Sequence, residues 1–66
     1  MRVVVNGEPV EVEDGATLEQ LLGELEVRRQ FTAVALNREV APRSAYATTI
    51  LREGDRVEIV HPMAGG

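Results

Sequence analysis

Residues 1–26 read MRVVVNGEPVEVEDGATLEQLLGELE, and the period of the hydrophobic residues changes once within this stretch. Its first half contains two short β-rich runs, MRVVV and EPVEV, joined by Asn6 and Gly7. An Asn-Gly pair tolerates the positive φ angles of a tight hairpin turn. We therefore expect two antiparallel strands, over residues 1–5 and 8–12.

The second half of the stretch, TLEQLLGELE (17–26), has the spacing of an amphipathic helix. Thr17 and Gln20, three residues apart, match a capping box at its start. Leucines recur at i, i+3, i+4 and i+7, a pattern that places them on one helix face. These leucines are Leu18, Leu21, Leu22 and Leu25.

The rest of the chain adds two more predicted strands, FTAVALN (31–37) and RVEIVH (56–61), the second preceded by the turn REGD. Between them lies the turn-rich segment APRSAYATTIL (41–51), in which Pro42 can begin a single helical turn. The predicted order is β-β-α-β-β, an α+β domain with one amphipathic helix across a small mixed sheet. The segment is expected to supply three core residues, Tyr46, Ile50 and Leu51.

Strand alternation divides the sheet residues between two faces. The face toward the helix is expected to carry Met1, Val3, Val5, Val10, Val12, Val34, Leu36, Val57 and Ile59. The opposite face is expected to show Val4, Ala35, Glu58 and Val60. We predict that Val4, Ala35 and Val60 form a small apolar patch on which a partner protein docks, since converging exposed apolar residues mark interaction surfaces.

Composition removes several classes of function. The 66 residues allow one small domain, and the absence of cysteine excludes a disulfide framework, a thiolate metal site and a cysteine nucleophile. His61 has no second histidine or cysteine to complete a zinc site, and Ser44 has no local partner base, so we expect neither a metal site nor a catalytic serine.

Charge and hydropathy exclude two kinds of partner. Seven acidic residues against one arginine give −6 over residues 1–26, and six arginines against four acidic residues give +2 over 27–66, for the net −4. An acidic chain repels phosphate backbones, so a nucleic-acid partner is not expected. No apolar run reaches the length of a signal peptide or a membrane span, so we expect a cytoplasmic protein without membrane contact.

The chain resembles the ThiS family, the sulfur carrier proteins of thiamin biosynthesis. The segments ALNREVAPR (35–43) and EGDRVEIVHPMAGG (53–66) carry the resemblance, together with the overall length. The family's strand ending in asparagine, Pro-Arg pair, Gly-Asp turn and terminal Gly-Gly correspond to Asn37, Pro42 with Arg43, Gly54 with Asp55, and Gly65 with Gly66. The resemblance implies a ubiquitin-like β-grasp domain over residues 1–61 and an extended tail over 62–66.

The resemblance also implies a function for the tail. A ThiF-type adenylating enzyme would join the carboxylate of Gly66 to AMP from ATP, and a persulfide-bearing partner would supply sulfur to form a thiocarboxylate. Thiazole synthase would then receive that sulfur. The chain itself would catalyse nothing and hold no cofactor. Met63, Ala64 and Gly65 would lie extended in a narrow channel of the adenylating enzyme, where a side chain at Gly65 would meet the wall.

Two alternatives stay open on the sequence. The Gly-Gly ending is shared with the small subunit of molybdopterin synthase and with tRNA-thiolation carriers, and only the middle segment and the length favour thiamin. The other alternative is a non-catalytic β-grasp interaction module or protein modifier, which would be recognised through its sheet face.

Overall fold

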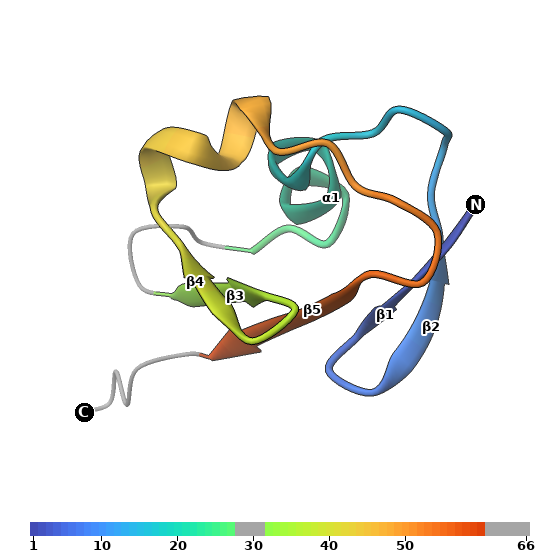
Figure 1. Cartoon of the computed structure of the whole chain (residues 1–66), viewed down its shortest axis with the longest axis horizontal. Coiled ribbons are helices and arrows are strands. Elements are labelled where there is room, and N and C mark those ends of the chain that lie inside the picture. Colours follow the sequence, from blue (N-terminus) through green and yellow to red (C-terminus); the bar gives the residue numbers. More distant parts are fainter. Residues whose placement is uncertain (28–31, 61–66) are drawn as a thin grey trace.

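The computed structural model describes residues 1–27 and 32–60, and these form a mixed sheet with a helix packed across one face (Figure 1). This arrangement confirms the predicted α+β class and the packing of the helix on the sheet. The elements in chain order are β1 (Arg2–Val5), β2 (Glu8–Glu11), α1 (Leu18–Glu24), β3 (Ala33–Leu36), β4 (Glu39–Ala41), the 3-10 helix η2 (Arg43–Thr48) and β5 (Arg56–Val60).

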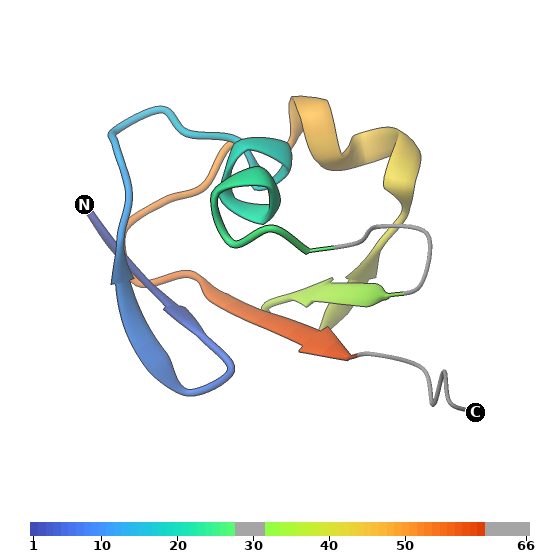
Figure 2. The same cartoon turned by 180° about the vertical axis from the view of Figure 1, so that it is seen from behind.

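The sheet has five strands in the order β2-β1-β5-β3-β4, so the last strand of the chain lies in the middle. β5 runs parallel to β1 and antiparallel to β3, and each of these neighbours pairs antiparallel with an edge strand. β5 pairs with β1 over its first two residues and with β3 over residues 57–60. Figure 2 shows α1 and η2 together on one side of this sheet.

Both hairpins turn on an asparagine with a positive φ angle. Asn6 (φ 49°) and Gly7 (φ 85°) join β1 to β2, as predicted. Asn37 (φ 51°) and Arg38 (φ 71°) join β3 to β4 in the same way. The prediction of four strands was wrong, because it omitted β4. This strand has only three residues, and its turn contains no glycine, whereas the turn of the first hairpin contains Gly7.

Helix α1 is shorter than the predicted 17–26. Its start is confirmed. The backbone N–H of Gln20 donates to Thr17 Oγ1 at 3.2 Å, and the backbone N–H of Thr17 donates to Gln20 Oε1 at 2.8 Å. It ends at Glu24 because Glu26 turns to φ 58°, which directs the Glu26 and Val27 amides back to the carbonyls of Gly23 and Leu22. This Schellman arrangement ends the helix two residues before the predicted end.

The core lies between α1, η2 and the sheet. Its buried apolar residues are Val3, Val5, Val12, Leu18, Leu21, Leu22, Val34, Tyr46, Leu51, Val57 and Ile59. The remaining residues predicted to face the helix, Met1, Val10 and Leu36, are partly buried against this cluster. The predicted inward face of the sheet is therefore confirmed.

Leu25, which shares the predicted leucine face of the helix, and Ile50, which was predicted to enter the core, are both exposed. Leu25 is 38% exposed because it caps the end of α1 and lies beyond the helix face that contacts the sheet. Ile50 is 59% exposed, whereas Leu51 is buried. Ile50 bridges to Thr17, and the Leu51 amide donates to the Ala16 carbonyl. In this extended segment consecutive side chains point to opposite sides, so only Leu51 can enter the core.

Candidate functional site

The residues predicted to carry the function come after β5 in the sequence. Met63, Ala64, Gly65 and Gly66 lie outside the described residues, as does His61. The last described position is Val60, at the C-terminal end of the central strand. The structure therefore defines the strand that leads toward these residues.

The amide of Asn6 holds β5 close to this end. Ile59 N donates to Asn6 Oδ1 at 2.8 Å, and Asn6 Nδ2 donates to Ile59 O at 3.3 Å. The Asn6 backbone N–H bonds the Val57 carbonyl at 2.9 Å. The side chain thus supplies the next step of the parallel ladder after β1 has turned away into its hairpin. The sequence identified Asn6 only as a turn residue.

Asn37 holds the other end of the same strand. Arg56 N donates to Asn37 Oδ1 at 3.0 Å, and Asn37 N donates to the Arg56 carbonyl at 2.8 Å. Asn37 Nδ2 also donates to Asp55 Oδ1 at 3.2 Å. The two turn asparagines therefore fix the first and the next-to-last residues of β5.

The outer face of the sheet, away from α1, carries the predicted docking residues. Val60 is 60% exposed and pairs with Ala33, while Ala35 pairs with Glu58 two residues along the same two strands. Val4 pairs instead with Arg56 on the other side of β5. The charged side chains of β5 thus lie between Val4 and the other two predicted residues.

Val40 joins Ala35 on this face and was missed. It pairs directly with Ala35 and is 77% exposed. The prediction assigned no strand to residues 39–41, so strand alternation was never applied to them. The turn-forming Asn37 and the apolar Val40 three residues later were the available signal for a second hairpin.

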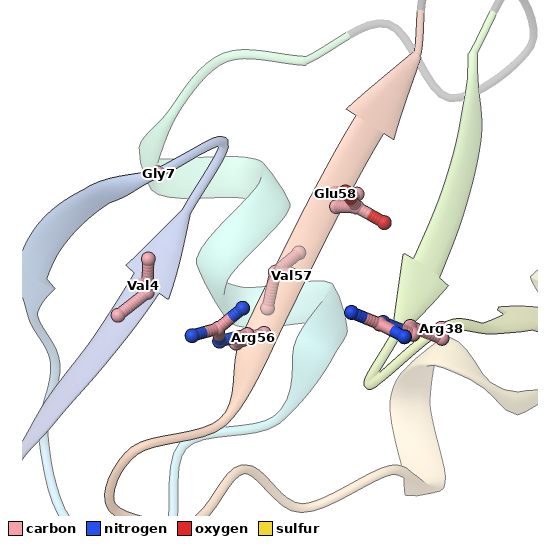
Figure 3. A pocket seen from close by; sticks show the side chains of 6 residues that line it. All are labelled: Val4, Gly7, Arg38, Arg56, Val57 and Glu58. Atoms are coloured by element: carbon pink, nitrogen blue, oxygen red, sulfur yellow. The ribbon is translucent and has the colours of Figure 1, made fainter.

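A hollow of about 300 Å³ opens on the outer face between β1, β5 and the β3–β4 turn (Figure 3). We call it the outer-face hollow, and its lining residues are Val4, Gly7, Arg38, Arg56, Val57 and Glu58. The charged side chains of Arg38, Arg56 and Glu58 all border it. No pattern in the sequence indicates that Arg38 and Arg56 lie at one site.

Within the part of the chain that the structure describes, no group of three or more His, Cys, Asp or Glu residues is arranged to hold a metal ion. No helix in that part is long and apolar enough to cross a membrane.

Comparison with known proteins places the chain in a family. The model of the ThiS family matches residues 3–66, which include every described strand and helix beyond the first residue of β1. The chain belongs to the ThiS family. Resemblance in sequence had implied this membership, and the match confirms it.

Individual ThiS relatives agree in sequence and in fold. The sulfur carrier protein ThiS of Thermus thermophilus is 42% identical over 64 residues, covering 97% of this chain and 98% of that protein. The crystal structure of the thiamine biosynthesis protein ThiS from Geobacter metallireducens superposes with a TM-score of 0.86 at 36% identity, and covers 100% of both chains. This likeness confirms the predicted ubiquitin-like β-grasp.

A third relative is a longer protein. The thiazole synthase of Paramagnetospirillum magneticum is 42% identical over all 66 residues of this chain, which span only 20% of its length. A second thiazole synthase, from Magnetococcus marinus, is 41% identical over the same 66 residues, which again span 20% of its length. ThiS-like sequence therefore occurs both as a separate protein and as a segment of thiazole synthases.

Proposed function

We propose that this chain is a sulfur carrier protein of thiamin biosynthesis and that Gly66 carries the sulfur. The observation that supports it most is the family match through residue 66, joined to a ThiS crystal structure that covers the whole chain. In this proposal residues 1–61 form the domain that partners recognise, and residues 62–66 form the arm that they modify. The chain acts as a co-substrate and catalyses no step.

The chemistry requires activation of Gly66. A carboxylate is a poor electrophile because it has no good leaving group. Its oxygen therefore attacks the α-phosphorus of ATP on a ThiF-type adenylating enzyme, which releases pyrophosphate and leaves an acyl-adenylate. The terminal sulfur of a persulfide-bearing donor then attacks the Gly66 carbonyl carbon as AMP departs, which gives an acyl disulfide. A second thiol of the donor cleaves this S–S bond, leaving the thiocarboxylate on Gly66 and a disulfide on the donor. The thiocarboxylate passes its sulfur to thiazole synthase.

The outer face of the sheet is proposed as the docking surface for these partners. Val60, Ala35 and Val40 lie on three adjacent strands, and Val60 immediately precedes residues 61–66. We expect Val60→Glu to weaken binding of both the adenylating enzyme and thiazole synthase, because it would bury an unpaired charge at the contact. Val60 is largely exposed, so the thermal stability of the free chain should change little.

Intact mass of the protein isolated from cells tests the proposal. Replacement of one oxygen by sulfur at Gly66 supports a sulfur carrier, and this requires that Gly66 has a free carboxylate in the cell. Isopeptide adducts on other proteins would show a protein modifier instead. Loss of thiamin alone on deletion of the coding sequence, with molybdopterin and thiolated tRNA retained, would separate this role from the two other carrier functions.

Variants of the last two residues give the sharper prediction. Deletion of Gly66 should abolish ATP-dependent adenylation while leaving the melting temperature unchanged, because the core that the structure describes lies within residues 1–59. Gly65→Val should lower the adenylation rate by roughly 100-fold, since small misplacements of a reacting group have effects of that size. Ala47→Val, at an exposed position of η2, is the matched control. Sulfur loading that persists without Gly66 would refute the assignment.

A further inference from the structure

The Arg38 side chain is presented from a backbone conformation that disfavours arginine. Its φ of 71° lies in the left-handed region, where a side chain is strained and glycine is preferred. The molecule provides its own comparison, because the corresponding position of the first hairpin is Gly7 at φ 85°. Glycine at position 38 would therefore give a more stable fold than arginine does. We infer that the Arg38 side chain has a role other than stabilising the fold.

Arg56 borders the same hollow from β5. The bonds of Asn37 to the Arg56 N–H and carbonyl, at 3.0 and 2.8 Å, tie the backbone of the β3–β4 turn to the start of β5. Arg38 is the next residue in that turn. One asparagine thus ties the backbones of the two arginines together. In Figure 3 the Arg38 side chain is directed toward β5 and the Arg56 side chain toward β1, and both residues line the outer-face hollow.

Neither guanidinium group has an anionic partner among residues 1–27 and 32–60. Arg2, on the same face, pairs with Glu11 at 3.1 Å, but Arg38 and Arg56 form no such ion pair with a described carboxylate. Glu58 also borders the hollow, but it forms no ion pair with either arginine within 4.0 Å in the described part of the chain. Two neighbouring cations without a partner repel each other, and an anion placed between them would remove that repulsion.

We propose that the outer-face hollow receives the carboxylate of an Asp or Glu side chain from the protein that docks on the sheet. A guanidinium group can donate two parallel hydrogen bonds to one carboxylate, and the partly exposed side chain of Val4 offers an apolar contact for the stem of such a side chain. Glu58 at the rim disfavours a doubly charged phosphate. A protein carboxylate therefore fits this hollow better than a nucleotide or free phosphate does.

The inference rests on the proposed function for the identity of the partner, which is the adenylating enzyme. The test titrates that enzyme, from the same organism, with the wild-type chain, Arg38→Gly, Arg56→Gln and Arg43→Gln by calorimetry. Arg43 is an exposed arginine at the start of η2, in the layer on the other side of the sheet, and serves as the charge-matched control.

Arg38→Gly should change stability and binding in opposite directions. Removing the strained side chain should raise the melting temperature by a few degrees. Loss of the guanidinium should weaken enzyme binding roughly tenfold, as should Arg56→Gln, and both variants should show a weaker dependence of Kd on salt. A residue with only a structural role would not give a more stable fold that binds less well.

Other outcomes overturn the proposal. Wild-type affinity for Arg38→Gly and Arg56→Gln, or an equal loss for Arg43→Gln, would show that the hollow does not contribute to docking. Saturable binding of inorganic phosphate to the free chain at these arginines, abolished by the same variants, would assign the hollow to a small anion instead. Intact mass reports the thiocarboxylate separately, so failure of the hollow and failure of the proposed function are distinguishable.

Discussion

The side chain of Asn6 fills a gap in the parallel ladder between β1 and β5. The backbone of β1 turns into its hairpin after Val5, whereas β5 continues to Val60. The carboxamide has the same donor and acceptor as a peptide group, so it can bond both the N–H and the carbonyl of Ile59. Asn6 thus serves two needs, a positive φ angle in the turn and an additional ladder step on the strand.

Asn6→Gly tests the ladder step without disturbing the turn, because glycine also accepts φ 49°. Losing two part-buried hydrogen bonds should lower the free energy of unfolding by roughly 1–2 kcal/mol. The Ile59 amide should also exchange its hydrogen faster with solvent. Asn6→Asp keeps only the acceptor for the Ile59 N–H, and we expect an intermediate loss. Unchanged exchange at Ile59 in the glycine variant would contradict this account.

At the scale of elements, α1 begins with favourable residues and ends with an unfavourable one. Its capping box satisfies the first turn, but Glu26 occupies the left-handed position of the Schellman motif at φ 58°, where glycine is usual. The carboxylate of Glu26 also lies at the negative end of the helix dipole. The end of α1 is therefore held by its packing: Leu22 is in the core, and Val27, whose N–H closes the motif, is partly buried against it.

Glu26→Gly should stabilise the protein by about 1 kcal/mol, because it relieves the left-handed strain and removes the unfavourable charge. Glu24→Gly is the matched control, since it removes the same charge from the exposed last residue of the helix, where φ is not positive. There glycine should destabilise the protein by about 0.5–1 kcal/mol. Urea denaturation of both variants measures the difference, and a loss of stability in Glu26→Gly would show that its φ angle is not strained.

At the scale of the whole molecule, one small core supports every element. A domain of 66 residues has a free energy of unfolding of roughly 3–10 kcal/mol. The core packs against the inner face of β5, and the turn residues Asn6 and Asn37 bond the strand from its two sides. Its loss would therefore release the strand that leads to the proposed sulfur-carrying residue.

Leu21→Ala should unfold most of the population or leave the domain marginally stable. The side chain is fully buried, and truncating such a leucine costs about 2–5 kcal/mol. Leu25→Ala, four residues along the predicted leucine stripe, should cost less than about 1 kcal/mol because Leu25 is 38% exposed. Thermal melts followed by circular dichroism compare the two. Equal losses would mean that Leu25 contributes to the core after all.

The sequence by itself determined the features that depend on neighbouring residues. The Asn6-Gly7 hairpin, the Thr17 and Gln20 capping box, and the inward face of the strands follow from turn chemistry and from periods of 2 and 3.6 residues. Together with the family resemblance, they were sufficient to predict the fold. The roles of residues 63–66 stay predictions, because these residues lie outside the described structure.

Only the tertiary structure decided the features that join distant residues. The Asn6 bonds to Ile59 span 53 positions, and Asn37 reaches Arg56 across 19. The exposure of Ile50 likewise depends on which segment pairs with which. Short-range patterns in sequence carry no information about such pairings, because strand order and register are set by the packing of the whole sheet. For the same reason Arg38 and Arg56 meet at one hollow only in the folded chain.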